Sequence, residues 1–430
     1  MRETLFFHPD DIREVFAAAG ANGPLGRTIR GGFLEREAII GTQGLVMSEG
    51  ALWKRQRRIL APGMHRQRIV EYTDAMVDFA ESMCDDWKQG GVLPMQREME
   101  NLTLKIMART LFGPELTTDQ IHEIKRAMDR QLLLNGIEIT IANGLVPQIP
   151  TPLRTSLRKA SNHLRGLFQA VIDRRLAEDD DTRAQRNTDL LDMLLEARDD
   201  DGSTMSMQQL GDEMHNMFLG GYETSSNALA FIAALMARHP QIQDLVVDEV
   251  RNTVGGARLT FEHISELRLT EAVVREALRL YPPVFALPGH VVTSNVRLAG
   301  YDFTPGQRVN VCPYATHRDP RWFDTPDEFR PQRWLDGSTD DLHRSAWIPF
   351  GGGARVCYGQ NFAMAEIILV LAVMIRRFEF SLPPGESSDI EATLSGSFML
   401  KAKNDTAVLT ARTDAPVPTL DSTHRSTATT

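Results

Sequence analysis

The stretch that decides the fold reads Phe350-Gly351-Gly352-Gly353-Ala354-Arg355-Val356-Cys357-Tyr358-Gly359. Its glycines allow the backbone to turn tightly beneath the cysteine sulfur and to aim N–H groups at it. A helix is predicted to begin just after Cys357, and its positive end would lower the pKa of the thiol. A cysteine thiolate is an electron-rich axial ligand of haem iron, and Arg355 can offer a planar fork to a haem propionate. We therefore predict that Cys357 is an iron ligand; the alternative is a small buried cysteine after a flexible turn.

Two long helices are predicted near this stretch in the fold. The clearest runs from Met207 to Arg238, where Ser206 and Gln209 have the spacing of a capping box and apolar residues recur at steps of mostly three or four. The pattern ends at His239-Pro240. At about 1.5 Å per residue this helix would be roughly 45 Å long, enough to cross a whole domain. The second helix, from Gln360 to Ile375, is apolar almost all round and is predicted to be buried.

Between these two helices the pattern changes. A helix from Thr270 to Leu280 is predicted to stop before Pro282, because proline disfavours helical geometry in the residue that precedes it. Short alternating or β-branched segments from Val291 to Val311 predict a small sheet with turns. Residues from His317 to Leu335 predict an ordered meander without regular secondary structure. The fold class is therefore mainly α with a smaller β region, that is, α+β.

The centre of the long helix carries Gly220-Gly221-Tyr222-Glu223-Thr224-Ser225. Two glycines inside a helix cost about 1 kcal/mol each relative to alanine, and the close approach of a flat cofactor or of O₂ would explain Gly220 and Gly221. Glu223 and Thr224 place an acid and an alcohol in an otherwise apolar element, which is what catalytic proton delivery requires. The alternative is a helix kink at small residues with Thr224 bonded back to its own backbone.

Composition excludes several classes of function. The chain has 430 residues, is 42% hydrophobic and 24% charged, and has a formal net charge of −10, which fits a folded protein and disfavours nucleic-acid binding. The three cysteines are far apart in sequence and exclude a CxxC zinc cluster. No signal peptide or membrane anchor is visible at the start, and the apolar stretch from Ile367 to Ile375 is too short to span a bilayer. We therefore expect a cytoplasmic protein without a membrane anchor.

The motifs together resemble one known family. The spacing F-x-x-G-x-R-x-C-x-G is similar to the haem-binding signature of the cytochrome P-450 superfamily, in its bacterial form, and residues 220–225 resemble its oxygen-activation motif, (A/G)-G-x-(D/E)-T-(T/S). Glu276 to Arg279 resembles its E-x-x-R element, and Pro331 to Trp334 its later P-x-R-aromatic element. The resemblance covers about Leu5 to Leu382. It implies a P-450 fold, a b-type haem, and a structural network of Glu276, Arg279 and Arg333 that locks the haem-binding loop.

The resemblance also implies which residues hold the cofactor. Trp53 and Arg57 are similar to the family's W-x-x-x-R pair, whose members donate hydrogen bonds to a haem propionate. His290 is the nearest substitute for the arginine that the family usually places after the Pro-Pro. The complete set of expected cofactor-binding residues is Trp53, Arg57, Gly220, Gly221, His290, Phe350, Gly353, Arg355 and Gly359. The basic residues Lys54, Arg55 and Arg58 could steer an acidic electron donor, or form only a solvated face.

We expect a single haem-thiolate monooxygenase domain over residues 1–412, followed by a disordered tail over 413–430. Relative to the family, we expect the first helix and the elements before it to be missing. The expected reaction inserts one oxygen atom from O₂ into a hydrophobic small molecule that resembles a fatty acid, terpenoid or polyketide. The electrons would come ultimately from NAD(P)H through a separate ferredoxin or flavodoxin-type donor. We expect the enzyme to be a monomer.

The substrate is expected to lie under a lid from about Gln131 to Arg165, whose loop is predicted at Ile137 to Pro152. Two alternatives stay open. One is a haem-thiolate peroxygenase or isomerase, against which Glu223 and Thr224 count. The other is a non-catalytic haem binder.

Overall fold

The computed structural model of the chain describes residues 3–20, 23–27, 41, 43–88, 91–142, 151–179, 181, 189–198, 202–287, 289–395 and 399–413. The helices of this part are α1 (Pro9–Ala18), α3 (Gly50–Leu60), α4 (Arg66–Asp86), α5 (Met95–Phe112), α6 (Thr118–Ala142), α7 (Pro152–Leu176), α9 (Leu190–Glu196), α10 (Met207–Arg238), α11 (Pro240–Val254), α12 (Arg268–Leu280), α13 (Pro313–Thr316) and α14 (Gln360–Arg377). The strands are β1 (Glu3–Phe6), β2 (Leu25–Arg27), β3 (Val92–Pro94), β4 (His290–Val292), β5 (Val296–Leu298), β6 (Tyr301–Phe303), β7 (Arg308–Val311), β8 (Phe378–Ser381), β9 (Ala392–Leu394), β10 (Leu400–Ala402) and β11 (Thr406–Ala411).

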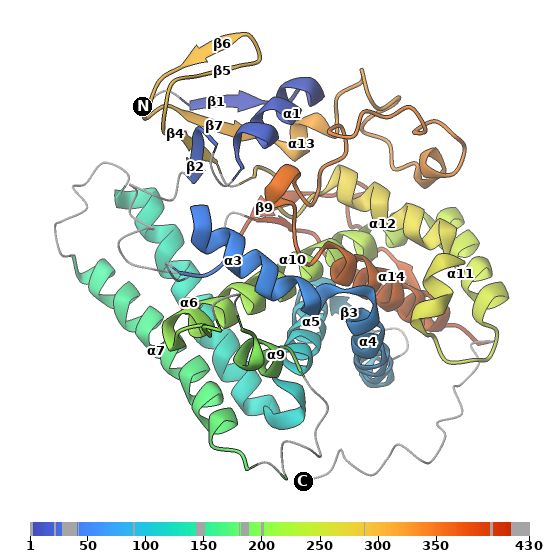
Figure 1. Cartoon of the computed structure of the whole chain (residues 1–430). Coiled ribbons are helices and arrows are strands. Elements are labelled where there is room, and N and C mark those ends of the chain that lie inside the picture. Colours follow the sequence, from blue (N-terminus) through green and yellow to red (C-terminus); the bar gives the residue numbers. More distant parts are fainter. Residues whose placement is uncertain are drawn as a thin grey trace.

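The helix α10 runs through the centre of the molecule (Figure 1). Its start is fixed by the predicted capping box, in which the Gln209 amide donates to Ser206 Oγ at 3.2 Å and the Ser206 amide donates to Gln209 Oε1 at 2.8 Å. Every residue from 225 to 237 is buried, and the helix packs most extensively against α5 and also against α14, α12 and α7. The predicted bounds and the role of this helix as the core axis are confirmed.

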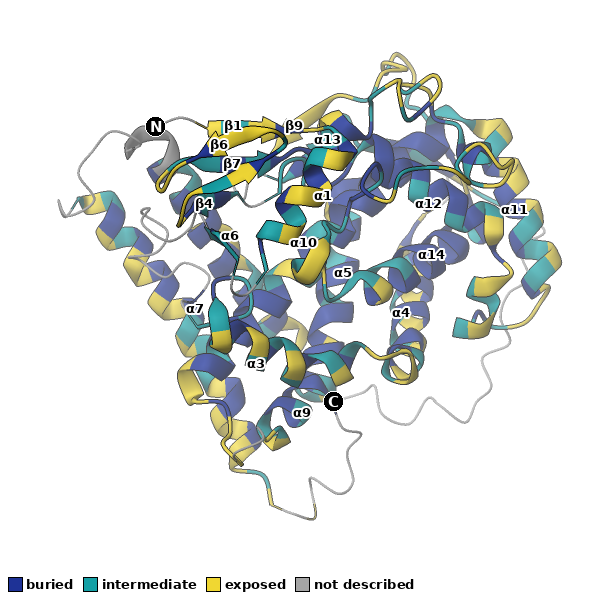
Figure 2. Ribbon diagram, turned by 45° about the horizontal axis from the view of Figure 1, so that its top comes forward, coloured by how far each residue is buried: buried dark blue, intermediate teal, exposed yellow. Residues whose placement is uncertain are grey.

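The helices α12 and α14 also follow the prediction closely. α12 begins at Arg268 instead of Thr270 and ends at Leu280 as expected. α14 begins at Gln360 as expected and continues to Arg377, and its residues from 365 to 376 are all buried. Figure 2 shows the same burial as a dark blue core around α10, α5 and α14.

The small sheet is present and is larger than predicted. Its strand order is β1-β7-β4-β2, with β1 parallel to β7 and the other pairs antiparallel. The predicted turn at Gly300, where φ is +80°, joins β5 and β6 as a separate hairpin. The sheet gains β1 and β2 from the first thirty residues of the chain, which the alternation between Val291 and Val311 could not reveal.

Of the remaining predictions about the fold, one is confirmed, one boundary is wrong, and others concern residues outside the described part. Residues 317–335 are irregular as predicted, apart from a short 3₁₀ helix at Pro331–Trp334. The lid loop was predicted to begin at Ile137, but α6 continues to Ala142, so that boundary is wrong. The apolar residues and the three prolines of this stretch, the first of them Pro147, could not show that the helix continues to Ala142. Residues 143–150 of this loop, Pro288 and the expected tail from 414 onward lie outside the described residues.

The small two- and three-stranded sheets complete the fold. β3, β11 and β8 form one antiparallel sheet, and β9 pairs with β10. No helix of the described part is long and apolar enough to cross a bilayer.

Candidate haem-thiolate site

The cysteine loop, residues 347–359, contains a tight turn that needs glycine at two positions. Gly351 and Gly353 have φ of +72° and +65°, which L side chains rarely adopt. A Cβ added to Gly353 would also lie 2.9 Å from the Cβ of Phe16 on α1. The turn closes where the Cys357 amide donates to the Phe350 carbonyl at 2.9 Å. The predicted need for glycine is therefore met by backbone geometry and by the close approach of α1.

The pKa of the Cys357 thiol departs from the prediction. Burial among protein atoms raises this pKa, while the Gly359 amide and the positive charge of Arg57 lower it. The net direction is upward, so the predicted lowering is wrong: one helix end and one cation do not outweigh the loss of solvation. The side chain itself is still accessible, unlike Cys84 and Cys312, which are buried.

Side chains from α3 meet the cysteine loop. Arg57 Nη1 donates to the Val356 carbonyl at 3.0 Å, and its guanidinium lies 5.9 Å from the centre of the Tyr358 ring. Arg355 lies 4.6 Å from the centre of the Trp53 ring and donates from Nη2 to the Ser48 carbonyl at 3.0 Å. The fold thus brings Trp53 and Arg57 of α3 together with Arg355, which lies about 300 positions later in the sequence.

The arrangement fits a bound haem. The second nitrogen of Arg355, Nη1, is buried and has no hydrogen-bond partner among the described residues. A buried guanidinium nitrogen without a hydrogen-bond partner costs free energy, so an anionic group such as a propionate would stabilise it by accepting its hydrogen bond. Burial also lowers the pKa of Arg355, although a guanidinium stays protonated at any working pH.

The two glycines of α10 differ from each other. A Cβ at Gly220 would meet nothing within 4 Å, which leaves open space of the kind a flat cofactor needs. A Cβ at Gly221 would lie 2.3 Å from Met107 Sδ on α5. The prediction that both glycines make room for a cofactor is therefore wrong for Gly221, whose missing side chain lets α5 pack closely.

The acid and the alcohol of α10 have separate partners. Thr224 Oγ1 donates to the Gly220 carbonyl at 2.7 Å, as the structural alternative anticipated. A hydroxyl that donates one hydrogen bond still has lone pairs that can accept others, so Thr224 can accept a hydrogen bond from a proton donor. Glu223 is buried and accepts a hydrogen bond from Ser395 Oγ at 3.0 Å.

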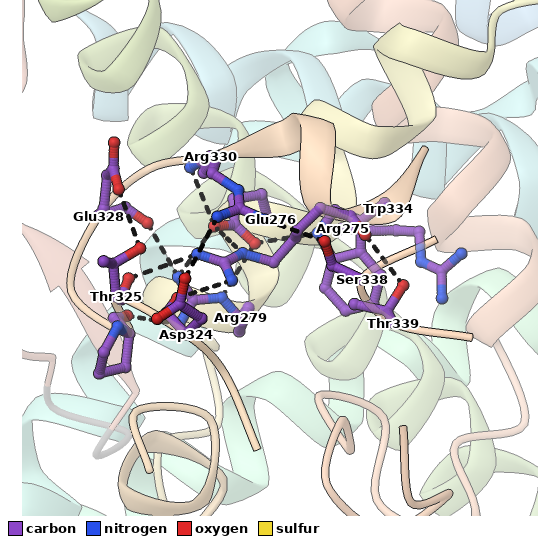
Figure 3. A network of polar contacts seen from close by, with 12 residues as sticks. Arg275, Glu276, Arg279, Asp324, Thr325, Glu328, Arg330, Trp334, Ser338 and Thr339 are labelled. Carbon is purple, nitrogen blue, oxygen red and sulfur yellow. Dashed lines mark hydrogen bonds and ion pairs between the residues drawn. The ribbon is translucent and has the colours of Figure 1, made fainter. Parts of the chain in front are cut away.

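The expected charged network is present and fully buried (Figure 3). Glu276 binds Arg279 through two bonds of 2.9 Å, and Arg333 Nε donates to Glu276 Oε1 at 3.0 Å. Trp334 Nε1 and the Arg330 amide donate to the same carboxylate at 2.9 and 3.0 Å. Two cations and five donors therefore surround one carboxylate, which is how a buried charge becomes tolerable.

The remaining predicted residues are placed as follows. Phe350 is half-buried and packs edge-on against Trp347, with ring centres 6.3 Å apart. Gly359 precedes α14, and a Cβ there would meet nothing within 4 Å. His290 is the buried first residue of β4, opposite Val309 of β7.

Two of the buried titratable residues that sequence reasoning missed lie close to the site. His317 opens the meander that the sequence showed only as irregular, yet it contacts both α12 and the cysteine loop. Glu366 is fully buried inside α14, where burial raises its pKa to about 8 and a hydrogen bond from Ser225 opposes the rise. A histidine directly before Arg318-Asp319-Pro320, and a lone acid in an apolar helix, were the signals available.

A cysteine turn followed by a buried helix, packed beneath a long helix that carries an acid and an alcohol, defines the class of haem-thiolate oxygenases. The chain belongs to the cytochrome P450 family: residues 2–408 match the family model described as "Cytochrome P450". It is a cytochrome P450 monooxygenase, and the family holds haem through a cysteine thiolate.

The chain is similar to several characterised relatives. It is 31% identical over 384 residues to "Cyclooctatin synthase" of Streptomyces melanosporofaciens, covering 88% of this chain and 80% of that protein. It is 30% identical to "Pentalenene oxygenase" of Streptomyces avermitilis, covering 88% of this chain and 81% of that protein. The solved "cytochrome P450DA heme domain" has a TM-score of 0.82 at 23% identity, covering 95% of this chain and 87% of that one, so it shares the fold.

Proposed function

We propose that Cys357 is the iron ligand of a b-type haem and that the enzyme hydroxylates or epoxidises a terpenoid. For hydroxylation the balance is substrate C–H plus O₂, two electrons and two protons, giving C–OH and one water. Haem, when bound, supplies the activation of O₂ and the transfer of one oxygen atom. The single observation that carries the proposal is the turn from Phe350 to Cys357, whose positive-φ glycines present an accessible thiol.

The residues around this turn would hold the cofactor by its carboxylates. Arg355 has a buried nitrogen in need of an anion, and Trp53 lies against the same guanidinium. Arg57 is held by the Val356 carbonyl beside them. We assign these three to one propionate and His290 to the other. Gly220 would leave room for the porphyrin ring, together with Gly359 on the cysteine side, whereas Gly353 would allow the turn to pack against Phe16 of α1.

Protons would be managed from α10. Thr224, whose hydroxyl hydrogen is donated to the Gly220 carbonyl, would accept a hydrogen bond from the group that delivers the proton, and Glu223 would exchange that proton from the neighbouring position on the helix. The Ser395 contact holds Glu223 toward β9 and β10, so we expect it to act after a change of rotamer or through water. An isomerase has no need of this pair.

The substrate proposal rests on the relatives. Pentalenene oxygenase acts, by its name, on pentalenene, and another relative, "Cyclooctat-9-en-7-ol 5-monooxygenase" of Streptomyces melanosporofaciens, 28% identical over 387 residues, acts by its name on cyclooctat-9-en-7-ol. Both compounds are cyclic terpenoids. Of the three classes that the sequence left open, a terpenoid is therefore favoured over a fatty acid or a polyketide.

Electrons would come from NAD(P)H through a ferredoxin or flavodoxin-type protein. Lys54 and Arg58 are exposed on α3, the same helix that anchors Arg57 to the cysteine loop. They could attract an acidic donor to this face. We further propose that residues 1–412 form a single domain.

The test begins with the reduced protein mixed with carbon monoxide. The red-shifted band of a thiolate complex is expected in the wild type and not in Cys357→Ser; a wild type that binds haem without this band would refute the ligand assignment. Turnover with a surrogate ferredoxin and cyclic terpene hydrocarbons follows. Thr224→Ala should divert most electrons to hydrogen peroxide, whereas unchanged coupling would refute its proton role.

A further inference from the structure

His317 connects the buried charged network to the cysteine loop. It is fully buried, its Nδ1 lies 3.1 Å from the Arg279 carbonyl, and its Nε2 accepts from the Ile348 amide at 2.8 Å. A second hydrogen bond joins the same two residues, because Arg279 Nη1 donates to the His317 carbonyl at 2.7 Å. One imidazole thus joins the end of α12 to a residue two positions before Phe350.

The hydrogen bonds fix the tautomer of this imidazole. The Ile348 amide can only donate, so Nε2 must be the unprotonated acceptor. Nδ1 then carries the proton and donates it to the Arg279 carbonyl. That carbonyl lies in the last turn of α12, where backbone oxygens lack a helical partner and need one from elsewhere. Burial lowers the pKa of His317 to about 3, so the imidazole stays neutral.

The bond to Ile348 continues into the turn itself. The Gly351 amide donates to the Ile348 carbonyl at 3.0 Å, and the Cys357 amide donates to the Phe350 carbonyl at 2.9 Å. The preceding residue is tied to α12 as well, because Trp347 Nε1 donates to the Arg275 carbonyl at 3.3 Å. Two consecutive loop residues are therefore attached to α12 one helical turn apart, and the His317 attachment passes through Arg279, which binds Glu276 directly.

We propose that His317 is a positioning residue for the thiolate ligand: it transmits the fixed position of the Glu276–Arg279–Arg333 network to the backbone of the cysteine loop. This inference rests on the proposed role of Cys357 as the iron ligand. His317 itself touches neither substrate nor cofactor. Without it, the loop keeps its turn and the Trp347 bond to α12 but loses the second anchor at its beginning, and the position of the sulfur is no longer fixed.

The experiment compares three variants of the haem-loaded protein. His317→Phe keeps the ring volume and removes both hydrogen bonds, while His317→Gln can still offer an oxygen to Ile348 and an N–H to Arg279. His215→Phe is the matched control, because His215 is also a buried neutral imidazole, stacked on Phe168 in α7 and distant in sequence from the loop. The readouts are the fraction of the carbon monoxide complex with the thiolate band and the exchange rate of the Ile348 amide hydrogen.

We expect His317→Phe to lose at least half of the thiolate band and to speed exchange at Ile348 by about tenfold or more, as expected when a buried hydrogen bond is removed. His317→Gln should recover most of both, and His215→Phe should change neither. Unchanged spectra and exchange in His317→Phe, or equal losses in all three variants, would overturn the proposal. A wild type without the thiolate band would instead refute the proposed function.

A further measurement does not depend on whether the variants fold. In the diamagnetic carbon monoxide complex of the wild type, nitrogen-15 spectra of labelled histidine report which ring nitrogen carries the proton. We expect His317 to be protonated at Nδ1 alone. A proton at Nε2 would contradict the bond to Ile348 and with it the proposal.

Discussion

Adjacent glycines of α10 should respond in opposite ways to the same substitution. In a helix interior alanine is favoured over glycine by about 1 kcal/mol, so without other contacts both Gly220→Ala and Gly221→Ala would stabilise the protein. The new methyl group at 220 meets nothing within 4 Å. We therefore expect Gly220→Ala to raise the free energy of unfolding of the haem-free protein by about 1 kcal/mol.

At Gly221 the new Cβ would lie 2.3, 2.6 and 2.8 Å from Sδ, Cε and Cγ of Met107. Met107 is buried on α5, the helix against which α10 packs most extensively, so it has little room to withdraw. Overpacking of this kind costs about 1–3 kcal/mol, which cancels or exceeds the helix gain. Gly221→Ala should therefore be less stable than Gly220→Ala by about 1–3 kcal/mol.

Denaturant unfolding of the haem-free variants, followed by circular dichroism, measures this difference. A double-mutant cycle with Met107→Ala isolates the contact: that change should destabilise the wild type by a few kcal/mol and Gly221→Ala by clearly less. Equal stability of the two alanine variants, or no coupling between positions 107 and 221, would refute the packing explanation. The outcome expected also matches the family motif, which accepts alanine at the first position and glycine alone at the second.

The remaining predictions concern charged groups. Glu276→Gln should lower the free energy of unfolding by about 3–5 kcal/mol, because the substitution leaves two buried guanidinium groups without their carboxylate. The exposed control Glu266→Gln should change the free energy of unfolding by less than about 0.5 kcal/mol. Similar values for the two variants in denaturant unfolding would contradict this explanation. Burial raises the pKa of Glu213 to about 8, against 4.5 in the unfolded chain, so the folded state holds the proton more tightly and wild-type stability should fall as pH rises from 4.5 to 8. Glu213→Gln should remove this loss, by at most about 5 kcal/mol at high pH, and a difference between the two proteins that does not vary with pH would exclude the buried acid. Arg355→Leu should speed haem transfer to apomyoglobin by about 10–100-fold, the equivalent of one charge-assisted hydrogen bond, while Lys54→Leu on the same face should leave it unchanged; equal transfer rates would remove Arg355 from the propionate site.

The sequence predicts what depends on local spacing. The capping box at Ser206 and Gln209, the proline after α12 and the apolar run of α14 each act within a few residues, and the bounds of these helices were correct to within two residues. The glycines of the cysteine loop belong to the same category, because a positive φ is a property of one residue.

What the sequence could not show depends on contacts between distant segments. Nothing near Gly221 indicates that Met107 fills the space beside it, and nothing near Thr4 indicates that β1 joins the sheet through β7. The pKa of Cys357 was predicted in the wrong direction for the same reason. Helix polarity can be read from the sequence, whereas the burial that outweighs it comes from the whole fold.

The cysteine loop is held at both ends by parts of the chain that are remote from it. Its beginning is tied to α12 through Trp347 and Ile348, and its later part is tied to α3 and to Ser48 through Val356 and Arg355. Because α12 packs directly on α14, the helix that begins just after Cys357, a shift of either helix would move the sulfur relative to its anchors. A signature of ten residues can identify the ligand, but the position of the sulfur is a property of the assembled helices. Variants in α12 that never touch the cofactor should therefore alter the spectrum of the bound haem before they abolish folding.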